Sequence, residues 1–138
     1  IRDTCRDWSS DVCSSDLDIE FLVQGLQLIH ASECPEIIDG NTLTALRLLA
    51  ENAFIPVEIS EFLTETYIFL RKTEHILQLF EDLQTPTLPL GKQEQEALAR
   101  RAGMKRPEFM DRCEKEMARV HNTFIQFLAG KMFTEKSV

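Results

Sequence analysis

The stretch Y-I-F-L-R-K-T-E-H-I-L-Q-L-F-E-D-L-Q-T-P-T-L-P, residues 67–89, decides the fold. Through it and just upstream, apolar and threonine side chains recur every three or four residues, the period of one buried helix face. These positions are Phe62, Leu63, Thr66, Leu70, Thr73, Leu77 and Phe80. Pro56 and Pro86 bracket the pattern, and we expect a helix of roughly 27 residues, about 40 Å long, against which the other helices pack.

A polar stripe follows the same predicted helix. Arg71, His75, Gln78 and Asp82 succeed one another at spacings of four, three and four, and Glu74 lies beside them. Such spacings place the side chains along one edge of a helix. On the spacing alone, the favoured interpretation is an ordinary solvated face held by pairs four residues apart, and a binding surface is the alternative.

The remainder of the chain predicts four more helices and no sheet, because no segment alternates polar and apolar residues with period two. Turn and capping signals place these helices at about 18–32, 41–52, 92–102 and 107–130. The first has apolar residues spread widely around it and is expected to be largely enclosed. The predicted fold is all-α, an antiparallel bundle of about five helices in which the third and fifth are the long members.

Residues 1–17 are not expected to belong to this bundle. Asp7 to Leu17 back-translates, codon by codon, to the text of a common short-read sequencing adapter. We interpret residues 1–17 as a non-native or disordered segment, 18–130 as the helical domain and 131–138 as a frayed tail. A natural, flexible Ser/Asp-rich segment is the alternative origin of residues 1–17.

Composition narrows the classes of function. A net charge of −8 argues against nucleic-acid binding, which requires a clustered basic face. The apolar runs are far shorter than the roughly 20 residues needed to cross a bilayer, and no membrane partner is expected. Beyond residue 17 only Cys34 and Cys113 remain, without a CxxC motif, which suits a reducing, cytoplasmic setting. No His, Cys or carboxylate group has metal-ligand spacing, so no metal site is expected.

Three motifs together resemble a known family. They are D-I-E-F-L-V-Q at 18–24, N-T-L-x-A-L at 41–46 and L-R-x-x-E-H-x-L-Q-x-x-x-D-x-Q-T-x-x-L-P at 70–89. In this order and spacing they are similar to the helical domain of bacterial glutamine synthetase adenylyltransferases, over most of residues 18–128. That bifunctional family adds AMP to a tyrosine of glutamine synthetase and removes it.

The resemblance implies that two domains have different roles in the intact enzyme. A separate α/β nucleotidyltransferase domain, just upstream of a G-G-I-R run that precedes D-I-E-F in the family, would hold Mg²⁺ and ATP, ADP or phosphate. The helical domain would form the other wall of the cleft. This chain would then contain no catalytic residue and be inactive alone. Glutamine synthetase would be the substrate of the intact enzyme and the signalling protein PII its regulator.

Polar residues of the first and third predicted helices are the candidates for this cleft wall. They are Asp18, Glu20, Gln24, Arg71, Glu74, His75, Gln78, Asp82 and Gln84. An arginine could hold a phosphate oxygen, and amides could orient a nucleotide. For Asp18 and Glu20 the alternative is favourable charge at the positive pole of a helix. If the two helices presented these residues on opposite sides, the hypothesis would fail.

The run Q-T-x-x-L-P at 84–89 is more similar to the amino-terminal, adenylyl-removing half of the family, although Pro86 stands where the family often has His or Gln. Two other interpretations stay open. One is the related helical domain of a PII uridylyltransferase. The other is a non-enzymatic interaction module, in which the stripe Met110, Cys113, Met117, Val120, Phe124 and Phe127 docks a partner helix. A folded monomer with that stripe fully buried would count against the module.

Overall fold

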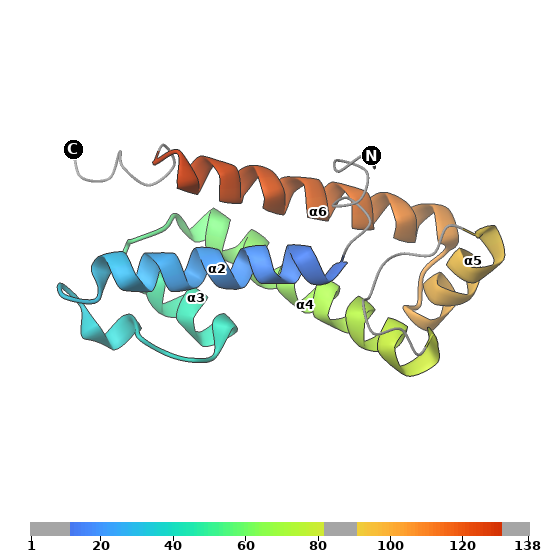
Figure 1. Cartoon of the computed structure of the whole chain (residues 1–138), viewed down its shortest axis with the longest axis horizontal. Coiled ribbons are helices and arrows are strands. Elements are labelled where there is room, and N and C mark those ends of the chain that lie inside the picture. The colour runs from blue at the N-terminus through green and yellow to red at the C-terminus, as the bar shows by residue number, and fades with distance from the viewer. Residues whose placement is uncertain (1–11, 82–90, 131–138) are drawn as a thin grey trace, which may run out of the picture.

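The computed structural model describes residues 12–81 and 91–130. Within these ranges the chain is all-α, with five α-helices, one short 3₁₀ helix and no strand (Figure 1). The elements are α2 (Val12–His30), η1 (Pro35–Ile37), α3 (Thr42–Glu51), α4 (Val57–Glu81), α5 (Lys92–Arg101) and α6 (Arg106–Leu128). The predicted all-α bundle of about five helices is confirmed.

Three long helices form the body of the bundle. α2 packs against both α4 and α6, and α4 also contacts α6. α4 runs opposite to α2 and α6, which are therefore parallel to each other (Figure 1). The short helices lie at the two ends, α3 against α4 and α2, and α5 against α6 and α4. This order places α2 and α4 side by side, the arrangement that the predicted cleft wall requires.

Local signals explain several of the helix ends. The side chain of Asn41 accepts a hydrogen bond of 3.0 Å from the amide of Thr44 and caps α3, as its sequence position predicts. Pro107 lies in the first turn of α6, where its missing amide costs nothing. Gly103, after α5, adopts a φ of +79°, a left-handed conformation that glycine reaches without strain. The prolines expected to end α4 lie outside the described residues.

The predicted apolar stripes form the core. On α4, Phe62, Leu63, Thr66, Leu70, Thr73 and Leu77 are all buried, while the side chain of Phe80 lies outside the described part. On α6, Cys113, Met117 and Val120 are buried, and Met110, Phe124 and Phe127 are partly buried against the same core. The α6 stripe therefore packs mainly within this chain, which weakens the interaction-module interpretation, although its burial is complete only at Cys113, Met117 and Val120.

α2 differs from its prediction in two ways. It begins at Val12, so residues 12–17 continue the helix upstream of Asp18. The origin of that segment stays a prediction. The helix is also less enclosed than its composition suggested, because Phe21, Leu28 and Ile29 are each more than half exposed. α2 occupies one edge of the bundle and buries only the sides that face α3, α4 and α6.

No helix in the described ranges combines the length and the apolar character that a membrane crossing requires.

Candidate functional site

Polar residues of α2 and α4 meet where these helices pack. The Tyr67 hydroxyl donates a hydrogen bond of 2.7 Å to Oε2 of Glu20. One turn further along α4, Nη1 of Arg71 lies 3.1 Å from Oε1 of Glu74 and 3.9 Å from Oδ2 of Asp16. We refer to Asp16, Glu20, Tyr67, Arg71 and Glu74 as the polar cluster. Its members come from two helices that the sequence separates by some fifty residues.

Burial varies sharply across the polar cluster. Asp16 is 2% exposed and Glu74 is 7% exposed, whereas the side chain of Arg71 is 55% exposed. The guanidinium therefore lies at the surface, above two buried carboxyl groups. Arginine carries five N–H donors in a planar fork, and the pairing with Glu74 uses only part of them. Because more than half of the side chain is exposed, an anionic oxygen could approach the guanidinium from solvent.

Asp16 is the anomalous member of the polar cluster. Neither of its carboxyl oxygens has a hydrogen-bond partner among the described residues. Burial, and then the neighbouring carboxyl group of Glu74, raise the pKa of Asp16 to about 9, against a smaller opposing effect of Arg71. Asp16 is therefore protonated and neutral at pH 7. The neutral form is favoured because burying a charged carboxylate without a close ion pair would cost free energy.

The contacts of Tyr67 and Arg71 shift their pKa values so that Tyr67 stays neutral and Arg71 stays charged. Burial and the hydrogen bond to Glu20 raise the pKa of Tyr67, so its hydroxyl remains a neutral donor. For Arg71, partial burial lowers the pKa, but the charge of Glu74, together with that of Glu20, raises it. The guanidinium is therefore a permanent cation beside the Glu20 and Glu74 carboxylates.

Three of the predicted site residues come together, namely Glu20, Arg71 and Glu74. They lie on one side of the bundle, so the condition on which the cleft-wall hypothesis depended is met for these three. What they bind stays a prediction. Gln24 and His75 are exposed on α2 and α4, each beside a member of the cluster. The side chain of Gln78 is not among those described, and Asp82 and Gln84 lie outside the described residues.

Asp18 does not join the polar cluster. Its Oδ2 lies 3.9 Å from Nδ1 of His121, so it faces α6. A helix turns by about 100° per residue, so Asp18 and Glu20 point to nearly opposite sides of α2. In the structure, α2 begins well upstream at Val12, and neither Asp18 nor Glu20 occupies its first turn. The alternative role of these acids, as favourable charges at the start of a helix, therefore does not apply here.

Sequence reasoning missed Tyr67 and Asp16. Tyr67 lies four residues before Arg71 and extends the same stripe, so its spacing was a usable signal. Asp16 had been set aside with residues 1–17.

Gln27, on the polar side of α2, is also buried, and its amide donates to the carbonyl oxygens of Ile37 at 2.8 Å and Asp39 at 3.0 Å. That side chain holds the connection between α2 and α3.

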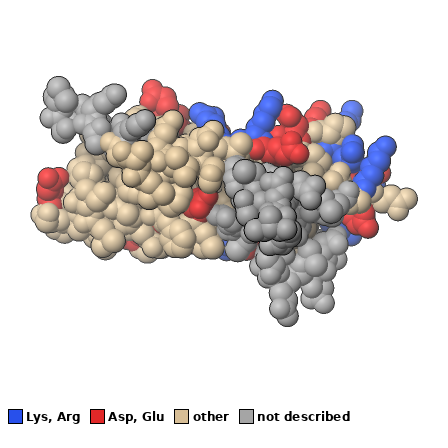
Figure 2. All heavy atoms as spheres, turned by 45° about the horizontal axis from the view of Figure 1, so that its top comes forward, with Lys and Arg blue, Asp and Glu red and all other residues tan. Residues whose placement is uncertain are grey.

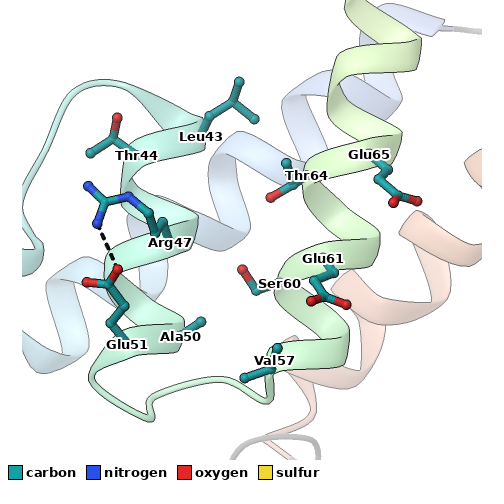
Figure 3. A pocket seen from close by; sticks show the side chains of 10 residues that line it. All are labelled: Leu43, Thr44, Arg47, Ala50, Glu51, Val57, Ser60, Glu61, Thr64 and Glu65. Atoms are coloured by element: carbon teal, nitrogen blue, oxygen red, sulfur yellow. Dashed lines mark hydrogen bonds and ion pairs between the residues drawn. The ribbon is translucent and has the colours of Figure 1, made fainter.

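A groove between α3 and α4 is separate from the polar cluster (Figure 3). Its volume is about 850 Å³. It is lined by Leu43, Thr44, Arg47, Ala50, Glu51, Val57, Ser60, Glu61, Thr64 and Glu65. Nη1 of Arg47 pairs with Oε2 of Glu51 at 2.8 Å on one wall, and the Ser60 hydroxyl donates to the carbonyl of Leu46. None of the predicted site residues lines the groove, and its polar side chains form no nucleophile and base pair.

The described residues do not fit a metal centre. No group of three or more His, Cys, Asp or Glu side chains among them is arranged to hold an ion. Within the polar cluster Asp16 is protonated and Glu74 is paired with Arg71. The Mg²⁺ that the family resemblance implies therefore has no ligand set in this part of the chain.

Fold and site together define an all-α domain that presents a polar surface on one edge and, in its described part, lacks a complete catalytic set. A family model described as GlnD PII-uridylyltransferase matches residues 17–128, and the chain belongs to this family.

The curated relatives carry a more particular name. A "Bifunctional glutamine synthetase adenylyltransferase/adenylyl-removing enzyme" from Alteromonas mediterranea is 36% identical over 108 residues, which are 78% of this chain and 11% of the relative. A protein of the same name from Nitrosomonas europaea is 36% identical over 115 residues, 83% of this chain and 12% of the relative. This chain thus spans only about a tenth of the relatives it matches. No solved structure shows significant similarity.

Proposed function

We propose that this chain is the helical domain of a bifunctional glutamine synthetase adenylyltransferase/adenylyl-removing enzyme and that it forms one wall of a nucleotidyltransferase cleft. The names of the relatives and the match over residues 17–128 support the assignment. The observation that carries the cleft wall is the hydrogen bond from Tyr67 to Glu20, because it brings the polar edges of α2 and α4 together beside Arg71.

Within this proposal Arg71 is the residue that meets an anion. Its side chain is more than half exposed and carries a permanent charge, which suit a phosphate oxygen of a nucleotide or of inorganic phosphate. Glu20 and Glu74 hold Arg71 and Tyr67 in place. Gln24 and His75 flank the cluster and contact the nucleotide or the substrate protein. The exposed position of both side chains supports this role.

The Q-T-x-x-L-P run favours the amino-terminal half of the enzyme, in which inorganic phosphate displaces the tyrosine of glutamine synthetase from AMP and ADP is released. Mg²⁺ and the nucleotide are then bound mainly by the neighbouring nucleotidyltransferase domain. The helical domain alone is inactive, and PII regulates the intact, cytoplasmic enzyme. The residues described here bind and orient phosphate groups and supply no proton transfer of their own.

A second candidate is the helical domain of a PII uridylyltransferase, which the description of the matching family model favours. The two candidates differ in the polypeptide that surrounds the domain. A uridylyltransferase continues into phosphohydrolase and ligand-sensing domains, whereas the adenylyltransferase carries a second nucleotidyltransferase half.

Sequencing the source DNA without adapter reads tests both assignments. We expect a G-G-I-R-like run directly before Asp18, preceded by a nucleotidyltransferase domain with paired aspartates and followed by a second such half. Phosphohydrolase and ligand-sensing domains downstream would favour the uridylyltransferase instead. A stop codon or an unrelated domain upstream of Asp18 would remove the enzyme assignment altogether.

A further inference from the structure

The carboxyl-terminal halves of α2 and α6 share an unusual composition. The sequence contains no Asp, Glu, Lys or Arg between Glu20 and Glu33, and none between Arg119 and Lys131. Elsewhere the chain is highly charged, since these four residue types make up 28% of it. The two uncharged stretches are far apart in the sequence, but they occupy parallel helices that pack together.

Two contacts place these stretches side by side. Near the middle of α2, Asp18 lies 3.9 Å from His121 of α6. Two turns later, a Cβ atom on Gly25 would lie 3.0 Å from the ring of Phe127. The glycine therefore allows the aromatic ring of α6 to pack directly on the backbone of α2. The contact between the two helices thus extends at least to Gly25 of α2 and Phe127 of α6.

Large apolar side chains point to solvent along this pair of helices. Phe21 and Leu28 of α2 are 52% and 80% exposed, and Ile125 and Leu128 of α6 are 47% and 63% exposed. Ile125 and Leu128 follow His121 by four and seven residues and share its edge of α6, the edge that adjoins α2. We refer to these four residues as the apolar face.

Figure 2 shows the same region as a broad area with few charged atoms, at the end of the molecule where α2 and α6 finish (Figures 1 and 2). Single exposed apolar residues are ordinary on a protein surface. A broad apolar surface with few charges indicates a contact with another polypeptide surface.

We propose that the apolar face is covered, in the intact enzyme, by the polypeptide that follows Gly130. This inference rests on the proposed function, which places the chain in the amino-terminal half of an enzyme of which it makes up about a tenth. α6 ends at Leu128, within the apolar face itself. The polypeptide that continues from it therefore reaches this surface through a short connection, at little cost in loop entropy.

The other neighbour of the domain is less well placed to cover this face. The upstream domain of the proposal connects through the start of α2, which lies near the middle of the molecule, at the other end of this helix from Leu28 (Figure 1). A second copy of the chain is disfavoured by repulsion between two molecules that each carry a net charge of −8. The part of the following polypeptide that meets α2 and α6 is thus expected to present an apolar or uncharged surface.

Hydroxyl-radical footprinting tests this contact. A hybrid of the Alteromonas mediterranea enzyme, in which residues 18–130 replace the aligned segment, is compared with the isolated chain. We expect oxidation of Phe21, Leu28, Ile125 and Leu128 to fall by about three-fold or more in the hybrid, because covered side chains lose contact with solvent. Val57 and Ile68, similarly exposed apolar residues of α4, serve as matched controls and should not change.

A truncated hybrid that stops at Gly130 identifies the covering segment. We expect it to lose the protection and to oxidise like the isolated chain. Protection that survives the truncation would assign the face to the upstream domain and overturn the proposal. Protection that grows with the concentration of the isolated chain would assign it to a second copy, with the same consequence. If the hybrid does not fold, the unaltered relative and its truncation give the same readout at the aligned positions.

This test is separable from that of the proposed function because footprinting needs no activity. A hybrid that is protected but neither adds nor removes AMP would count against the function alone. An active hybrid with an unprotected face would overturn only the contact.

Discussion

Tyr67 of α4 and Glu20 of α2 are joined by a hydrogen bond of 2.7 Å at the edge of the bundle, between residues that the sequence separates by 47 positions. The bond fixes the relative position of the two helices that carry the predicted cleft residues. It also sets Arg71, one turn beyond Tyr67, beside the same edge. The structural contribution of this bond can be measured apart from any activity.

Replacing Tyr67 by Phe should lower the free energy of unfolding by about 1 kcal/mol, because it removes a partly buried hydrogen bond and leaves Glu20 with one donor fewer. Urea unfolding followed by circular dichroism measures the change. In a double-mutant cycle, Tyr67→Phe and Glu20→Ala should each cost less in the presence of the other. Strictly additive effects would show that the two side chains are not coupled.

Asp16 should make the protein less stable as the pH rises. Its pKa is raised from 3.8 to about 9 on folding, so the folded state retains a proton that the unfolded chain releases between these values. The associated stabilisation is complete below about pH 4 and is lost as the pH rises towards 9. Unfolding free energies at pH 5 and pH 8 should differ in this direction, and Asp16→Asn should remove most of the difference.

A substitution of Asp16 also tests whether residues 1–17 are native to this protein. In the family, a G-G-I-R run directly precedes D-I-E-F. When the two sequences are aligned on D-I-E-F, this run places Ile at position 16, where this chain has a buried Asp. It places Arg at position 17, where this chain has an exposed Leu. The variant Asp16→Ile should therefore stabilise the chain at pH 8 by about 1–3 kcal/mol, because it removes a buried carboxyl group whose oxygens have no hydrogen-bond partner among the described residues. The exposed Asp111→Asn is the control. A marked loss of stability in Asp16→Ile would argue that the aspartate is native to this site.

Arg71 should matter for activity rather than for folding. In the hybrid enzyme, Arg71→Gln should reduce phosphate-dependent removal of AMP from glutamine synthetase by about ten-fold or more, because a charged donor to a phosphate oxygen is lost. Arg71→Lys should recover only part of the rate, since an ammonium group cannot reproduce the planar fork. Lys72→Gln, an exposed neighbour, is the control. Equal rates for the Arg71 and Lys72 variants would exclude Arg71 from the cleft.

Gly25 should tolerate no large side chain. Gly25→Leu would drive its side chain into the ring of Phe127 and should destabilise the protein by about 1–3 kcal/mol. Thermal or urea unfolding reports the change. Combining it with Phe127→Ala removes the collision, so the two costs should be less than additive. A Gly25→Leu variant as stable as the parent would mean that α2 and α6 do not pack this closely.

Helix positions were predictable because they depend on local patterns. The stripe on α4, the Asn41 cap and the Pro107 start all act within one or two turns, and each appears in the structure as the sequence indicated. The start of α2 was misplaced because residues 12–17 were set aside on their coding origin, although they continue the helix. Exposure of Phe21 and Leu28 was also not foreseen, because periodicity does not reveal which side of a wide apolar arc lacks a neighbour.

The sequence by itself determined the class of fold, the buried stripes and the family, since each rests on spacing along the chain and on motifs that need no tertiary contact. Tertiary structure decided which polar residues meet. It joined Glu20 to Tyr67 and Arg71 to Glu74, but turned Asp18 towards His121. It also set two uncharged stretches side by side on parallel helices. These outcomes depend on how the helices are rotated about their axes when they pack, a property of the whole core that no single segment encodes.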